Sequence, residues 1–144
     1  MRIAPTPLVL LLLAVPLAAH AGSVEVTASR LNVRSSAWGQ VLGQVPRGTQ
    51  FASRSSEGGW HRIDFGGRTA YVSGSYTRAG GAETLRVTAS TLNVRSGPST
   101  SASRIGQVGQ GQVYVRLARR SGWSEIQFDE RKGWVSERYV QSRG

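Results

Sequence analysis

The stretch VTASRLNVRS at residues 26–35 recurs as VTASTLNVRS at residues 87–96, and only Arg30 against Thr91 differs. Chance does not produce such a match in a chain of 144 residues, so the chain carries an internal repeat. The second copy has two extra residues in the loop after this stretch, where folded proteins tolerate insertion. Beyond that loop the copies correspond at a shift of 63 residues: Gly43 and Gly106, Gly59-Trp60 and Gly122-Trp123, Val72-Ser73 and Val135-Ser136, Tyr76 and Tyr139.

The first 21 residues have the pattern of a secretory signal peptide. Arg2 precedes an apolar run at residues 8–15, and Ala19-His20-Ala21 forms an A-x-A cleavage site. The alternative is an N-terminal membrane anchor, but the apolar run is short for a membrane span. We therefore expect cleavage after Ala21, no membrane anchor in the mature chain, and a periplasmic or secreted protein.

The repeat predicts two domains, at residues 22–79 and 85–144, joined by residues 80–84. The joint is short and rich in glycine, as a flexible linker is. The chain contains no cysteine, although small exported domains often carry disulfides. Each domain must therefore hold its fold by packing alone.

The apolar residues of each domain alternate with polar residues, as in half-buried strands. Val24 and Val26 follow one phase, whereas Leu31 and Val33 follow the other. A change of phase puts the two halves of the segment on different faces, so a bulge or bend is expected between them. Further strands are expected at residues 41–45, 50–54, 60–65 and 69–72, and at 104–108, 113–118, 123–128 and 132–135. The prediction is an all-β protein with two tandem small β-barrels after the signal peptide.

The series LNVRSGPS at residues 92–99, IGQV at 105–108, Gly122-Trp123 and GWV at 133–135, followed by Tyr139-Val140, resembles the bacterial SH3 (SH3b) family. Copy one departs from this pattern at three places: Ser36-Ala37-Trp38, Ala70-Tyr71 and Thr77. The resemblance implies a small SH3-like β-barrel in each copy. It also implies a targeting role, since known members hold enzymes or envelope proteins to peptidoglycan peptides or bind other proteins.

The net charge of +10 comes almost entirely from arginine, since Lys132 is the only lysine. Such a chain attracts anionic partners. Nucleic acid is the usual partner of a basic domain, but export separates this chain from it. Anionic polymers of the cell envelope are therefore the expected partners, and an arginine surface that serves only solubility is the alternative.

Trp38 lies in a loop of small and polar residues, where a large aromatic side chain has few core partners. It either marks a recognition surface or folds back over the end of the barrel. The other candidate ligand-binding residues lie near the first loop or where the copies differ, and each could equally be solvated or packed: Arg34, Tyr71, Arg95, Arg104 and Trp134.

The residue inventory argues against catalysis, and no catalytic residue, metal site or cofactor is expected. The chain has no cysteine, which excludes a Cys-His site, and His61 is the only histidine after cleavage, which is too few ligands for zinc. A Ser-His-Asp site would have to use this residue. We expect a non-enzymatic binding module for peptidoglycan or an associated anionic polymer. The alternative is an adaptor, inhibitor or immunity-type partner of another envelope protein.

Overall fold

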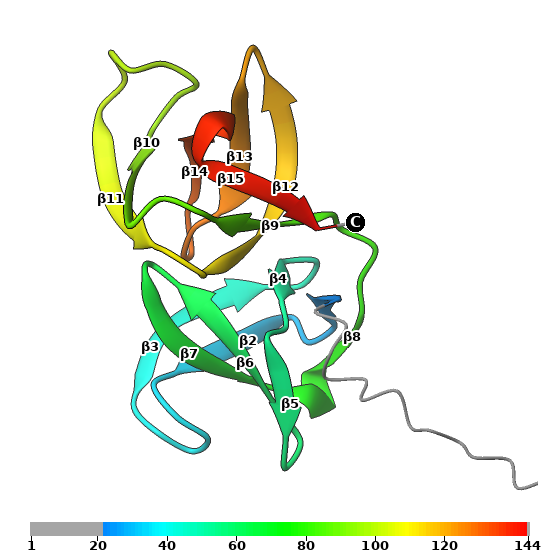
Figure 1. Ribbon diagram of the computed structural model, residues 1–144. Coiled ribbons are helices and arrows are strands. Elements are labelled where there is room, and N and C mark those ends of the chain that lie inside the picture. The colour runs from blue at the N-terminus through cyan, green and yellow to red at the C-terminus, as the bar shows by residue number, and fades with distance from the viewer. Residues whose placement is uncertain (1–21, 144) are drawn as a thin grey trace, which may run out of the picture.

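The computed structural model describes residues 22–143, which form two all-β units, as expected from the sequence (Figure 1). The signal-peptide prediction falls outside the described residues. Copy one contains eight strands and a short 3₁₀ turn: β1 (Ser23–Val26), β2 (Arg30–Arg34), β3 (Val41–Pro46), β4 (Gln50–Ala52), β5 (Ser55–Glu57), β6 (Trp60–Phe65), β7 (Arg68–Ser73), η2 (Gly74–Tyr76) and β8 (Thr77–Ala79). They form an antiparallel sheet in the order β3-β2-β7-β6-β5 and a smaller one in the order β4-β1-β8.

Copy two repeats this arrangement with one difference. Its elements are β9 (Thr84–Val87), β10 (Thr91–Arg95), β11 (Arg104–Gly109), β12 (Val113–Arg120), β13 (Trp123–Gln127), β14 (Lys132–Ser136), η3 (Glu137–Tyr139) and β15 (Val140–Arg143). The long strand β12 replaces both β4 and β5, so it joins the two sheets into one of order β11-β10-β14-β13-β12-β9-β15. The expected strand at residues 50–54 is thus shorter than predicted in copy one, because the chain breaks between β4 and β5. No helix in residues 22–143 is long and apolar enough to cross a membrane.

The bend predicted in the repeated stretch separates two strands that pair in different sheets. β1 pairs with β4 and β8, and after residues 27–29 β2 pairs with β3 and β7. Both halves point their apolar residues into the same core, which contains Val24, Val26, Leu31 and Val33. Copy two buries the corresponding side chains in a core of its own. The change of phase therefore lets one continuous segment cover a core from two sides.

The two copies meet through the same face of each, which gives the contact an approximate two-fold character. Strand β4 packs against β12, its counterpart, and Ala52 forms a buried apolar cluster with Val113 and Val115. On one side the Gly67 turn lies against copy two; on the other, the counterpart turn of Glu130 reaches copy one. The hydrogen bonds include Gly67 N–H to Tyr114 Oη (3.1 Å), Gln112 Nε2 to Gly67 O (2.8 Å) and Gln44 N–H to Glu130 Oε2 (3.4 Å).

Asp64 lies at the centre of this contact and is almost fully buried. Its Oδ2 accepts a hydrogen bond from the backbone N–H of Val113 at 2.8 Å, and its carboxylate pairs with Arg54 at 3.3 Å. Burial raises the pKa of Asp64 above its usual value of 3.8, although both of these partners favour the carboxylate. Gln127 holds the corresponding position of copy two, so the repeat has become asymmetric where the copies touch.

The connection between the copies is held along its length. Gly80 N–H donates to Ser23 O at 2.8 Å, and Ala82 N–H lies within hydrogen-bond distance of Ser23 Oγ and Gln50 Oε1. Beyond it, the Glu83 carbonyl accepts from Arg116 N–H. The flexible linker expected from composition is therefore a segment tied to both copies.

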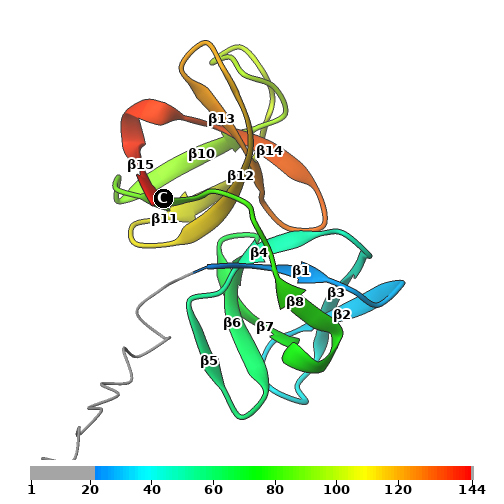
Figure 2. The ribbon, with the colours of Figure 1, turned by 90° about the vertical axis from the view of Figure 1, so that its right-hand side faces the viewer.

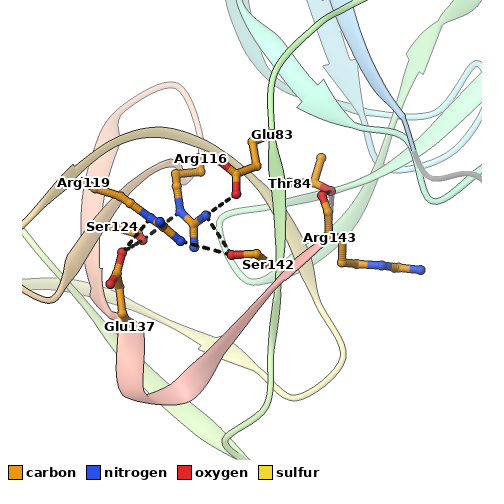
Figure 3. A network of polar contacts seen from close by, with 8 residues as sticks. All are labelled: Glu83, Thr84, Arg116, Arg119, Ser124, Glu137, Ser142 and Arg143. Carbon is orange, nitrogen blue, oxygen red and sulfur yellow. Dashed lines mark hydrogen bonds and ion pairs between the residues drawn. The ribbon is translucent and has the colours of Figure 1, made fainter.

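Figure 3 shows the polar network that fixes the end of this connection. The Arg116 side chain is buried, and its guanidinium pairs with the Glu83 carboxylate. It also donates to Ser124 Oγ at 3.0 Å and to Ser142 Oγ at 2.8 Å. A buried guanidinium needs such partners because its desolvation is costly. Copy one has Ser53 in place of Arg116, so this network belongs to copy two.

Candidate functional site

Each copy has a surface groove, and the two grooves are built from corresponding residues. Groove one has a volume of about 240 Å³ and groove two a volume of about 590 Å³. Groove one is lined by Ala28, Arg30, Leu31, Asn32, Arg34, Trp38, Trp60, Ser73 and Tyr76. Groove two is lined by Ala89, Thr91, Leu92, Asn93, Arg95, Thr100, Ser121, Gly122, Trp123, Ser136, Arg138 and Tyr139. The repeated stretch thus supplies one wall of each groove.

Each groove is also lined by a tryptophan and a tyrosine, and each of these residues follows or ends a turn. The aromatic pairs are Trp60 with Tyr76 and Trp123 with Tyr139. In copy two, Gly122 has a φ of +85°, a left-handed conformation that glycine adopts without strain, and Trp123 begins β13 directly after it. Ser136 caps the short turn η3, since its Oγ accepts from Arg138 N–H at 3.3 Å. That turn leaves Tyr139 45% exposed at the groove. Ser73 and Tyr76 repeat the device in copy one.

The arginines at the end of the repeated stretch close the first loop of each copy. Arg34 donates from a guanidinium nitrogen to Gly39 O at 2.9 Å, and Arg95 donates to Ala102 O at 3.0 Å. Both side chains also line a groove. One guanidinium nitrogen of each arginine is therefore bonded to the first loop, and this bond helps to position the side chain beside the groove.

Trp38 is the main difference between the grooves. Trp38 is 82% exposed, and its ring lies edge-on to that of Trp60, with 5.2 Å between the ring centroids. The two rings line both groove one and a second pocket, which contains Arg62 and Tyr71. The tryptophan pair therefore lies between groove one and this second pocket.

The backbone of Trp38 has a φ of +63°, a left-handed conformation that a bulky side chain rarely adopts. Such a residue costs about 1–2 kcal/mol relative to an unstrained one. Strain of this kind tends to occur at functional sites. The sequence left two alternatives for Trp38, a recognition surface or a side chain folded back onto the domain. The structure has features of both, since the ring packs against Trp60 and the residue stays exposed.

The polar groups of the grooves favour ligands with acceptor or negatively charged groups. Groove two contains Arg95 and Arg138, and none of the described residues in its lining is acidic. Groove one contains Arg30 and Arg34. Exposed aromatic rings beside these groups supply apolar faces, so each groove combines stacking surfaces with fixed hydrogen-bond donors.

The predicted site residues are only partly brought together. Arg34 and Trp38 line groove one, Tyr71 lines the second pocket, and Arg95 lines groove two. Trp134 lies opposite Arg95 on the next strand and is not part of the groove two lining, and neither is the exposed Arg104. The sequence analysis missed four groove aromatics, although their recurrence at matched positions was visible: Trp60, Tyr76, Trp123 and Tyr139.

His61 takes part in a small polar cluster away from the grooves. Its Nδ1 lies 2.9 Å from Ser53 Oγ and 2.9 Å from Ser56 Oγ. Burial lowers the pKa of His61, which favours the neutral ring. Within residues 22–143, no three histidine or acidic side chains gather as metal ligands would.

The fold and the paired grooves are those of two tandem copies of one small β domain. The chain belongs to the bacterial SH3 domain family, whose model matches it twice, at residues 29–78 and 90–141. The family resemblance predicted from the sequence is thereby confirmed. Each matched segment contains most of the repeated stretch, from Ser29 or Ser90 onward, and the tryptophan and tyrosine that line its groove.

Proteins similar to this chain include a curated relative and several solved structures. The relative, "Putative N-acetylmuramoyl-L-alanine amidase YrvJ" of Bacillus subtilis (strain 168), is 29% identical over 117 residues, covering 70% of this chain and 23% of the relative. The chain thus spans about a quarter of that protein's length. NlpC2 and NlpC1 from Trichomonas vaginalis are 14% and 16% identical over 85% of this chain and 48% and 46% of theirs, with TM-scores of 0.37 and 0.38. "Endolysin LysPBC5 CBD" is 16% identical over 85% of this chain and 93% of its own, with a TM-score of 0.37.

Proposed function

We propose that this protein is an exported, non-enzymatic module whose grooves bind peptidoglycan or an associated anionic polymer of the cell envelope. The observation that carries the proposal is the recurrence of one groove in both copies, built from corresponding asparagine, arginine, tryptophan, serine and tyrosine residues. A repeated groove suits a repeated ligand. Two weak sites in one molecule then increase the occupancy of a polymer or surface that carries many copies of the ligand.

The chemistry of the grooves supports this class of ligand. The glycan and peptide parts of peptidoglycan offer apolar faces, amides and carboxylates. Tyr139 and Trp123 supply rings, while Arg95 and Arg138 supply donors for carboxylates. The amidase relative is named for an N-acetylmuramoyl-L-alanine substrate, a unit of the same polymer, and membership in the bacterial SH3 family supports an extracytoplasmic location.

Co-sedimentation with purified sacculi at low salt tests the proposal. We expect the protein to sediment, and Tyr76→Ala combined with Tyr139→Ala to abolish sedimentation, since these exposed rings line the two grooves. Leu117→Ala is the matched control, because this residue is exposed on β12 and lies outside both linings. Absence of sedimentation, or a double variant that sediments like the wild type, would overturn the proposal.

The non-enzymatic part of the proposal has its own test. Dye-labelled sacculi are incubated with the protein under the conditions in which it binds. We expect no release of soluble labelled fragments, whereas release above a buffer control would show hydrolysis and contradict this part.

A second candidate function, recognition of an envelope protein by copy one, is favoured by Trp38. An exposed tryptophan in a strained loop is unmatched in copy two, where Thr100 lines the groove. Exposed tryptophans often anchor protein interfaces. Affinity capture from a periplasmic extract, with wild type and Trp38→Gly compared, tests it. A stoichiometric partner that is lost with the variant would support this function, and identical recoveries would contradict it.

A further inference from the structure

The contact between the copies determines how the two grooves are placed. Because each copy uses the same face for the contact, the parts of each copy that lie away from this face point away from one another. In Figures 1 and 2 the loop between β10 and β11 and the turn between β12 and β13 lie at one end of the molecule. The loop between β2 and β3 and the turn between β5 and β6 lie at the other end.

Three of these connections carry groove residues, and the fourth carries a residue of the second pocket. Thr100 and Gly122 come from the two connections of copy two, and Trp38 comes from the first loop of copy one. The second pocket beside groove one adds Gly58, from the turn between β5 and β6. The ligand-facing ends of the two copies therefore lie at opposite ends of the molecule, with the buried contact between them.

The grooves are also kept apart by the structure. The Asp64–Val113 hydrogen bond is buried at the contact, and Gly67 makes hydrogen bonds to copy two through both its N–H and its carbonyl. The connection is tied to copy one through Ala82 and to copy two through Glu83. A hinge would have to break these bonds together, so the copies do not swing to bring both grooves onto one short ligand.

We propose that the protein bridges two separate ligand segments, one held at each end, and so links two strands of the envelope polymer. This inference rests on the proposed function, since it takes the same ligand for both grooves. A single disaccharide-peptide unit fills one groove only. Two copies then link two strands, and they do not raise the affinity for a single disaccharide-peptide unit.

A two-layer capture experiment tests the bridge. Peptidoglycan fragments are immobilised on a surface, the purified protein is loaded, and soluble fluorescent disaccharide-peptide fragments are then added. We expect the loaded wild type to capture the second layer. Tyr76→Ala and Tyr139→Ala are loaded separately to the same density, since each retains one intact groove. We expect each variant to capture about ten-fold less, corresponding to a loss of about 1.4 kcal/mol or more at the removed groove.

The outcomes separate the bridge from the proposed function. If the wild type loads normally but captures no second layer, the bridge is wrong while polymer binding stands. If either single variant captures as much as the wild type at equal loading, the bridge is wrong as well. If the wild type does not load at all, the proposed function fails and the bridge falls with it. Leu117→Ala should capture like the wild type, because it leaves both grooves intact.

Discussion

The carboxylate of Asp64 in copy one accepts a hydrogen bond from the backbone N–H of Val113 in copy two, with 2.8 Å between Oδ2 and N. The bond is buried, so water cannot replace it when one partner is lost. It joins the two repeats at the centre of their contact, beside the apolar cluster of Ala52, Val113 and Val115. The stability of the tandem and the placement of its grooves therefore both depend on this pair.

We expect Asp64→Ala to lower the free energy of unfolding by about 1–3 kcal/mol, because the Val113 N–H is left buried without an acceptor. Asp64→Asn is the matched control, since its amide oxygen still accepts this hydrogen bond and the loss should be smaller. Urea denaturation of the three proteins measures the difference. Equal stabilities for Asp64→Ala and the wild type would show that the contact contributes little.

The raised pKa of Asp64 predicts a pH dependence. Between its usual value of 3.8 and its higher value in the fold, the folded protein binds more protons than the unfolded chain. The contribution of Asp64 is therefore fully present below pH 3.8 and is lost as pH rises through the folded-state pKa. We expect the difference in unfolding free energy between wild type and Asp64→Asn to fall over this window, as urea denaturation at a series of pH values would show. A difference that is flat or rises with pH would contradict a raised pKa.

Trp38→Gly separates recognition from stability. Glycine removes about 1–2 kcal/mol of backbone strain. It also loses the aromatic contact with Trp60, worth about 0.5–1.5 kcal/mol, and adds chain entropy to the unfolded state. We expect thermal and urea denaturation to show a stability within about 1 kcal/mol of wild type, while binding by copy one weakens. If the variant is strongly destabilised and binds every envelope component as before, the residue serves the fold alone.

Glu83→Gln should destabilise copy two, because the buried guanidinium of Arg116 loses its carboxylate partner. We expect a loss of about 1–3 kcal/mol in urea denaturation, since Glu83 itself is half-exposed. Glu25→Gln provides the comparison, as this carboxylate pairs with an exposed arginine, Arg78, whose exposed ion pair is worth about 0.2–1 kcal/mol. Equal losses for the two variants would contradict a special role for the buried network shown in Figure 3.

Much of the fold could be predicted from the sequence. The alternation of Val24 and Val26 and the changed phase of Leu31 and Val33 indicated a bent segment, and the structure bends there. The strands predicted at residues 60–65 and 69–72 pair as an antiparallel hairpin through Gly66-Gly67, where both glycines have a positive φ. These features depend on contacts within a few residues or on a two-residue period, which a sequence displays directly.

The candidate site was predicted less well. The prediction took Arg34 and Arg95 from the repeated stretch, and the other candidates from the first loop or from positions where the copies differ. In the structure Leu31 and Val33 are buried, whereas Asn32, which was not a candidate, lines groove one together with Arg34. A strand has two faces, so one shared segment supplies both core and groove.

The sequence by itself determined the two copies, their β structure, their family and the residue types available for binding. It did so because each copy is encoded by a local pattern that occurs twice. Only the tertiary structure decided which residues share a groove, that Trp38 packs against Trp60 beside the first of them, and that the copies meet face to face. Those relationships join residues far apart in the chain, such as Asp64 and Val113, and several depend on positions where the repeats differ. The repeat therefore specifies the unit, whereas the packing of unlike side chains at the contact specifies how two units are combined.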